Sequence, residues 1–387
     1  MSSILSTNWS FDSLPKEITT IILTNLSVKS ILRCRSVCKT LLGIIDNPHF
    51  PQLHLHTSTT KAAKYGNPSS SYIFHTRPIT EICIVTEEED ENKILCTNII
   101  SKFELLLGKP LGPILHAPVS GLLFYYAKEN GKYLMGVDTC SMYICNPATR
   151  EFVELPKFNP PQCSSHCFGD FAHGFGYDAI SKDFKVVLIF QPQVQIYTLG
   201  SNSWRTIGEV KITAIIDFTS VNFDGSLHWV DRGHLSTFKK NILSFNLSSE
   251  EFRVFGTPTL ICRPESLQLM AMGGCLSIFD PFFDNHIEVW MMKEYGVEES
   301  WTKICFSTVC FTGLQIFMPK AISVGKNSVI KLLVNSSALV SYNIETGSFT
   351  SVEVDGIEPP EGFPKFFGAF LFVESLITLK STCQREE

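Results

Sequence analysis

The sequence lacks the long apolar runs and the leader that membrane and secreted proteins carry. No run approaches the roughly 18 consecutive apolar residues that a membrane-spanning helix needs. The opening stretch, MSSILSTNWSF, has neither a positively charged region nor a long apolar core, so we expect no secretory signal. We therefore predict a protein of the cytoplasm, or also of the nucleus, that has no membrane partner.

Paired metal-binding motifs and the common catalytic motifs are missing as well. The 13 cysteines form no CxxC pair, and without a secretory signal they are expected to stay reduced and to pack as small apolar side chains. The sequence contains no GxSxG, no phosphate-binding GxxxxGK and no HExxH. We predict no catalytic residue, no cofactor and no metal ligand.

One cluster rich in histidine and cysteine contains residue types that can bind a metal. It consists of Cys163, His166, Cys167, Asp170 and His173. Zinc sites usually show paired ligands that recur at a second place in the chain, and no second pair matches Cys163 and Cys167. A connection between two strands is the favoured interpretation.

The net charge of −6 is unevenly distributed. Residues 1–50 carry five basic and three acidic side chains, a charge of +2, so the remainder carries −8. An acidic body argues against non-specific binding of nucleic acid. It is compatible with a basic protein partner, although solubility alone is the simpler explanation.

The segment 14–50 predicts three short helices that carry more apolar surface than so small a unit can bury. Pro15 suits a first helical position, and Ile18, Ile21 and Ile22 follow with helical spacing. Ser27 can cap a second helix, and a third ends before Pro48. The surplus is covered either by the domain that follows or by a partner protein, and the pattern alone leaves both explanations open.

The remainder of the chain predicts strands that repeat with a period near 50 residues. Residues 51–78 are polar and are expected to form an irregular linker, and short strands dominate from residue 79. Aromatic residues head the last strand of each repeat and are separated by 52, 48, 49 and 48 residues: Phe152, Trp204, Phe252, Trp301 and Phe349. This period, with about four strands per unit, indicates a kelch-like β-propeller.

The number of blades and the closure of the ring follow from the same anchors. Stepping back another 49 residues reaches Phe103, so six anchors predict six blades. The last strand, at 369–379, is expected to pair with the first blade and close the ring.

A flattened β-sandwich array is the alternative architecture. The regular placement of Trp204, Trp229, Trp290 and Trp301 favours blade core over a sugar-binding platform.

Specific motifs resemble a known family. The order Leu14-Pro15, Val28-Lys29-Ser30 and Val37-Cys38-Lys39, closed by Pro48 and Phe50, resembles a plant-type F-box; Ser27 stands where proline is usual and Leu41 where tryptophan is usual. GFGYDAISKDFKVVLI and IEVWMMKEYGVEESWTKI resemble the F-box-associated domain. NPATREF and the ending FVESLITL are most similar to the S-locus F-box group. The resemblance covers about residues 11–380.

The resemblance implies an α+β multi-domain protein: a three-helix F-box at 11–50, a linker at 51–78, and an all-β kelch-like β-propeller of about six blades at 79–380. F-box proteins dock on a Skp-type adaptor within a cullin–RING (SCF) ubiquitin ligase and recruit a substrate without doing chemistry. S-locus members recognise S-RNases, which are basic ribonucleases. The positions expected to contact the adaptor, or to hold the contact helices in place, are Leu14, Pro15, Ile18, Ile22, Leu23, Leu26, Val28, Leu32, Val37, Cys38 and Leu41.

Three alternatives to an S-RNase receptor stay open at this stage. The chain could receive an unrelated protein or a glycoprotein target. It could be an enzyme on a propeller fold, which would need convergent acidic and histidine groups at strand ends that one sequence does not reveal. It could also be a scaffold that binds the adaptor without causing degradation. The sequence gives no motif that names the target.

Overall fold

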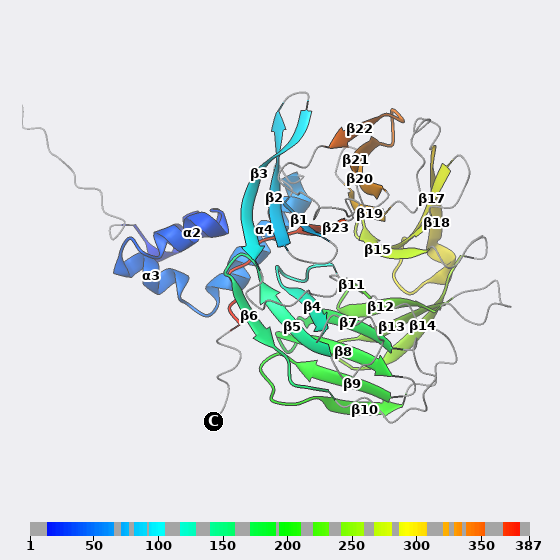
Figure 1. The fold of residues 1–387 in the computed structure, drawn as a ribbon, viewed down its shortest axis with the longest axis horizontal. Helices are drawn as coiled ribbons and strands as arrows, with labels where there is room; N and C mark the ends of the chain where they lie inside the picture. Colours follow the sequence, from blue (N-terminus) through cyan, green and yellow to red (C-terminus); the bar gives the residue numbers. More distant parts are fainter. Residues whose placement is uncertain are drawn as a thin grey trace, which may run out of the picture.

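The computed structural model describes residues 14–65, 71–76, 81–90, 93–104, 117–128, 140–158, 171–190, 193–209, 220–231, 241–258, 267–280, 286–307, 320–324, 329–334, 338–352 and 367–379. Helices gather at one end of the molecule, and strands form a ring of small sheets beside them (Figure 1). Among the helices described, none has the length and apolar character needed to cross a bilayer. Residues 163–170 of the His/Cys cluster lie outside the described residues, and His173 is a buried residue of a strand.

The first three helices begin and end near the expected positions. They are α1 (Lys16–Thr24), α2 (Val28–Cys34) and α3 (Lys39–Ile45). Pro15 occupies the cap position of α1, where its missing N–H costs nothing. The Ser27 hydroxyl accepts a hydrogen bond from the backbone N–H of Ser30, which caps α2 as expected.

A fourth helix replaces most of the predicted linker. Residues expected to be irregular form α4 (Phe50–Tyr65) instead. The prediction was wrong because the segment is polar almost throughout and shows no apolar periodicity, yet it contains neither glycine nor an interior proline that would end a helix. His54 is buried, and its Nε2 lies 2.9 Å from the Leu26 carbonyl oxygen, so α4 packs against the turn that follows α1.

The strands form six antiparallel sheets, numbered here as blades 1 to 6 in chain order. Blade 1 combines β1 (Ser71–Thr76), β2 (Glu81–Asp90), β3 (Lys93–Glu104) and β23 (Phe367–Phe372); blade 2 has β4 (Leu123–Lys128), β5 (Cys140–Asn146) and β6 (Glu151–Glu154); blade 3 has β7 (Phe171–Asp178), β8 (Asp183–Phe190), β9 (Gln193–Thr198) and β10 (Arg205–Glu209). Blade 2 therefore shows three strands among the described residues.

The other half of the ring repeats the four-stranded pattern. Blade 4 has β11 (Val221–Phe223), β12 (Ser226–Asp231), β13 (Asn241–Asn246) and β14 (Phe252–Gly256); blade 5 has β15 (Gln268–Met272), β16 (Cys275–Asp280), β17 (His286–Met292) and β18 (Trp301–Ser307), with a short 3-10 turn η5 (Glu298–Ser300); blade 6 has β19 (Lys320–Val324), β20 (Val329–Val334), β21 (Ala338–Asn343) and β22 (Phe349–Val352). Among the described residues, five blades therefore have four strands and blade 2 has three, where six blades were predicted.

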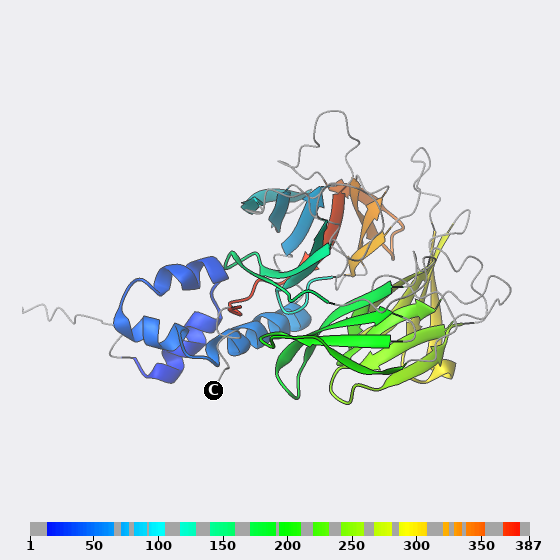
Figure 2. The ribbon, with the colours of Figure 1, turned by 60° about the horizontal axis from the view of Figure 1, so that its bottom comes forward.

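The ring closes as the sequence predicts. β23, from the end of the chain, pairs with β1, and Phe370 lies opposite Ile73. The strand ends at Phe372, so residues 373–379, which were expected to continue it, leave the sheet. In Figure 2 the red segment that follows β23 leads from the first blade towards the helices.

Apolar clusters between neighbouring blades hold the ring together. Trp229 is fully buried in the cluster shared by blades 3 and 4, which confirms its prediction as blade core. Two of the aromatic anchors tie their outer strand to the blade before it. The Trp204 indole N–H donates to the Pro156 carbonyl at 2.7 Å, and that of Trp301 donates to the Gly256 carbonyl at 3.1 Å.

Candidate docking surface of the N-terminal helices

The apolar stripe of α1 faces away from its own chain. Ile18, Ile21 and Ile22 are 45%, 58% and 41% exposed. The residues of α1 that are buried include two threonines, Thr19 and Thr24. A surface helix normally turns its apolar stripe towards the core, and α1 does the opposite.

Other apolar side chains of the same region are exposed as well. Leu14 precedes α1, Leu32 lies on α2, Val37 lies in the turn before α3, and Leu42 lies on α3. Val37 is 68% exposed, the largest fraction among these side chains. Single exposed apolar residues are ordinary, but so many within one short helical unit indicate a surface that another molecule covers.

A small internal core fixes the helices that carry this surface. Leu23, Val28, Ile31, Leu41, Ile44, Ile45, Phe50 and Leu376 form one buried cluster, and Leu26, Cys34, Cys38 and Ala148 pack against it. Arg35 and Asp46 add an exposed ion pair of 2.6 Å between the ends of α2 and α3. The orientation of the exposed side chains is therefore set by packing beneath them.

The predicted adaptor positions divide into three groups. Three are buried and belong to the internal core: Leu23, Val28 and Leu41. Two are half-buried beside it: Leu26 and Cys38. Six are exposed: Leu14, Pro15, Ile18, Ile22, Leu32 and Val37. Sequence reasoning left out Ile21 and Leu42, which are also exposed, although Ile21 has the helical spacing that placed Ile18 and Ile22 together.

Residues 373–379, called here the C-terminal connector, join the helices to the ring. Leu376 belongs to the core of the helices, whereas Ile377 and Leu379 belong to the core shared by blades 2 and 3. The Asn146 side-chain amide donates to the carbonyls of Ser375 and Ile377 at 3.0 and 2.8 Å. The chain therefore covers the inner side of the helices itself and leaves their outer side exposed, where a partner protein stays the expected cover.

The connector also contacts blade 2 closely and carries a charged side chain near α2. The backbone N–H of Leu379 donates to the Glu151 carboxylate at 2.9 Å. Gly121 has a positive φ of 79°, and a Cβ there would lie 2.6 Å from the Ser375 hydroxyl, so only glycine fits beside the connector. Burial raises the pKa of the Glu374 carboxyl, and the Lys29 ammonium on α2 opposes that rise.

A cleft of about 1170 Å³ opens beside the junction. Its walls come from α3 and α4 on one side, with Asp46 and Gln52, and from blades 2 and 3 on the other, with Glu151 and Tyr177. The cleft is lined by side chains of mixed charge, and among the described residues it brings no group of three metal ligands together. It marks where the helices and the ring are not in contact.

Comparison with known proteins agrees with this architecture. A family model described as the F-box associated beta propeller domain matches residues 75–374, and one described as the F-box domain matches residues 11–53. The F-box protein CPR1 of Arabidopsis thaliana is 25% identical, covering 94% of this chain and 89% of that protein. An F-box/kelch-repeat protein of Arabidopsis thaliana is 26% identical, covering 87% of this chain and 89% of that protein. The F-box protein DOR of the same plant is 23% identical, covering 92% of this chain and 91% of that protein. The chain therefore belongs to the family of F-box proteins that carry an F-box-associated β-propeller domain.

Proposed function

We propose that this protein is the substrate-recognition subunit of an SCF ubiquitin ligase, in the cytoplasm or nucleus, and that it performs no chemistry itself. Its F-box would dock on a Skp-type adaptor, and its propeller would bind the protein to be ubiquitinated. The observation that carries the proposal is the outward apolar stripe of α1, formed by Ile18, Ile21 and Ile22. Full burial of one such side chain contributes roughly 1.5–3 kcal/mol, so a few half-exposed residues suffice to anchor an interface.

The arrangement of the ring supports different roles for its two ends, one next to the F-box and one free to bind the target. Ala148, in the turn between β5 and β6, packs against the core of the helices, and Lys182, in the turn between β7 and β8, lines the cleft beside them. One end of the blades is therefore occupied by the F-box. The target would be held at the opposite strand ends, and its lysines would then stay at high effective concentration near the ligase.

A basic protein is the target class that the charge favours. The chain beyond residue 50 carries a net charge of −8, and an opposite potential on the target would speed their encounter. The resemblance of NPATREF and FVESLITL to the S-locus group makes an S-RNase the specific candidate. Binding of a purified S-RNase that weakens steeply with added salt would support this target, and a neutral or acidic protein recovered instead would contradict it.

The docking proposal is tested by removing the stripe without touching the core. The double variant Ile18→Ala, Ile22→Ala should lose most adaptor binding in a pull-down with a purified Skp-type adaptor. Both side chains are exposed, so the fold should keep its thermal stability. Leu14→Ala with Pro15→Ala is expected to act in the same way.

A matched control removes an exposed isoleucine elsewhere. Ile180→Ala takes away a side chain that is 81% exposed in the turn between β7 and β8, and adaptor binding should stay at the wild-type level. Adaptor retention by the α1 double variant equal to that of Ile180→Ala would overturn the assignment of the docking surface.

A further inference from the structure

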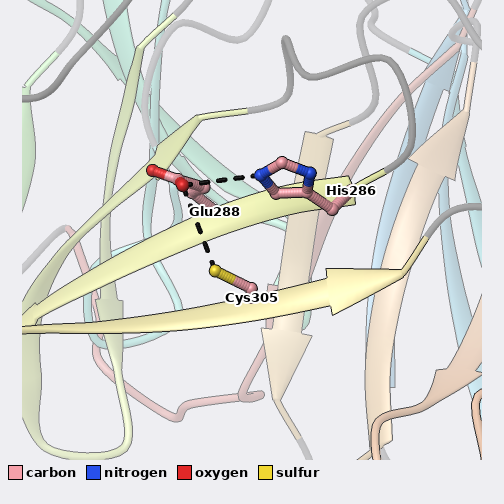
Figure 3. A group of neighbouring side chains, drawn as sticks. All are labelled: His286, Glu288 and Cys305. Atoms are coloured by element: carbon pink, nitrogen blue, oxygen red, sulfur yellow. Dashed lines mark hydrogen bonds and ion pairs between the residues drawn. The ribbon is translucent and has the colours of Figure 1, made fainter.

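Three side chains with metal-ligand chemistry meet on blade 5, away from the F-box. Figure 3 shows His286 and Glu288 on β17 and Cys305 on β18 pointing towards one another. His286 and Glu288 are two residues apart on one strand, so their side chains share a face of the sheet. Glu288 lies directly opposite Cys305 in the strand register. The fold therefore brings an imidazole, a carboxylate and a thiol to one point.

The distances between these groups are close to those of a metal site. The His286 Nε2 lies 3.5 Å from the Glu288 Oε1, and the Cys305 Sγ lies 4.0 Å from the same oxygen. All three ligand atoms lie within 4.8 Å of one another. In a tetrahedral zinc site with bonds of about 2.0–2.3 Å, neighbouring ligand atoms are about 3.3–3.8 Å apart. Small side-chain rotations would bring the three groups to that spacing.

We propose that His286, Glu288 and Cys305 bind a zinc ion, with a water molecule as the fourth ligand. A thiolate with an imidazole and a carboxylate suits zinc better than calcium or magnesium, which prefer oxygen ligands alone. Cys305 is exposed and forms no disulfide, so an ion can reach it from solvent. The Trp290 indole N–H donates to the Glu288 Oε2 at 3.3 Å, which orients the carboxylate and leaves Oε1 for the metal.

Lys303 is the competitor that the ion must displace. Its Nζ lies 2.9 Å from the Glu288 Oε1 and 5.4 Å from the centre of the Trp290 ring. The Lys303 side chain is 38% exposed, so it can move into solvent when zinc takes the carboxylate oxygen. The alternative interpretation is that Lys303 and Glu288 form an ion pair and no zinc binds. The two interpretations predict different effects on zinc binding when Lys303 is replaced.

The site lies at the end of the blade that is far from the helices. His286 begins β17 and Cys305 is near the end of β18, whereas the turns that face the F-box join the opposite ends of the strands. Zinc there would fasten two strands together at the end where the target is proposed to bind. The site depends only on the fold of blade 5, whether or not the F-box docks on an adaptor.

The test uses the full chain, freed of metal by a chelator and then titrated with zinc or cobalt ions alone. The wild type should bind one zinc ion, and the affinity of Cys305→Ser for zinc should be about tenfold or more lower. Cobalt bound to the wild type should give a near-ultraviolet thiolate absorption, which Cys305→Ser and His286→Ala should both lack. Zinc should also raise the melting temperature of the wild type but not of Cys305→Ser. Cys275→Ser, which removes another thiol of the same blade, should behave as the wild type.

Lys303→Met separates a metal site from a simple ion pair. If zinc and Lys303 compete for the Glu288 oxygen, the loss of the ammonium should tighten zinc binding. Unchanged or weaker binding by Lys303→Met would contradict the proposal. Zinc affinity and cobalt absorption that stay the same in Cys305→Ser as in the wild type, with both proteins equally folded by circular dichroism, would overturn it.

Discussion

At the scale of single residues, His228 shows how a buried polar group is retained in a blade core. Its Nε2 lies 2.7 Å from the Tyr295 hydroxyl, and its Nδ1 lies 3.3 Å from the Val221 carbonyl oxygen. Aromatic rings of Phe223 and Phe255 pack around it. Burial lowers the pKa of His228 to about 4. Hydrogen bonds between its imidazole and the backbone oppose this effect but are smaller.

This lowered pKa predicts that blade 4 is sensitive to mild acid. The unfolded chain takes up a proton near pH 6.5 and the folded chain only near pH 4, so the free energy of unfolding should decrease as the pH falls through that window. The histidine contributes on the order of 3 kcal/mol to the total decrease. Urea unfolding followed by tryptophan fluorescence at pH 7.5, 6 and 5 measures it.

Two variants isolate the contribution of this histidine. His228→Gln cannot take up the proton, so its stability should depend less on pH in this window although it is lower at neutral pH. His49→Gln removes an exposed histidine in the turn between α3 and α4 and should keep the wild-type pH dependence. Equal pH dependence in all three proteins would show that His228 is not the group responsible.

At the scale of elements, the C-terminal connector decides how the F-box sits on the ring. Leu376 is buried among the helices, and the residues that follow it are buried between blades 2 and 3. Rotation of the helices against the ring would therefore expose apolar surface on both sides. The helix α4 also reaches both cores, since Phe50 belongs to the core of the helices and Leu55 packs against the core shared by blades 2 and 3.

Leu376→Ala should loosen the F-box while leaving the blades intact. Truncation of a buried leucine costs about 2–5 kcal/mol, and the cavity would lie within the core of the helices. Hydrogen exchange of the amides of α1 to α3 should become faster, and that of β8 and β13 should not change. Leu371→Ala, which shortens an exposed leucine on β23, is the matched control. Equal acceleration in the blades would argue against a local effect.

The sequence predicts some of these elements and not others, for identifiable reasons. Most blades were predictable because an aromatic residue stands at the start of the outer strand in blades 2 to 6, and Trp204 and Trp301 tie that strand to the preceding blade. The sixth predicted anchor, Phe103, was placed wrongly, since it lies at the end of β3 and not at its start. The helix α4 was missed because its segment is mostly polar and shows no apolar periodicity. A further signal went unused: Asn146, Asn246 and Asn343 each accept hydrogen bonds from two backbone N–H groups of the turn that follows, so the asparagine marks the same turn in three blades.

The docking surface was predictable only in part. Helical spacing places Ile18, Ile21 and Ile22 on one face of α1, but spacing does not determine whether that face lies inside or outside. The outcome depends on Leu376 and Asn146, and the hydrogen bonds between Asn146 and the connector join residues 229 and 231 positions apart. Contacts so distant in the chain leave no periodic pattern, so the position of the helices on the ring could not be predicted.

At the scale of the whole molecule, the two ends of the propeller chain depend on each other. β23 supplies the inner strand of blade 1 and lies beside β19 of blade 6. Its loss would leave β1 with an unpaired edge and break the ring between the last blade and the first. Because each blade buries its faces against its neighbours, the effect should spread beyond blade 1.

A graded series of truncations tests this dependence. A chain that ends at residue 365 lacks both β23 and the connector and should lose cooperative thermal unfolding or aggregate. A chain that ends at 372 keeps β23, so the ring should still unfold cooperatively, although at a lower temperature because Ile377 and Leu379 are lost from the core of blades 2 and 3. Its F-box helices should exchange their amides faster. A chain that ends at 379 keeps both segments and should match the full-length protein by circular dichroism and melting temperature. A chain that ends at 365 and still melts cooperatively near the wild-type temperature would show that the ring does not need β23, because blades 2 to 6 would then stay folded without closure.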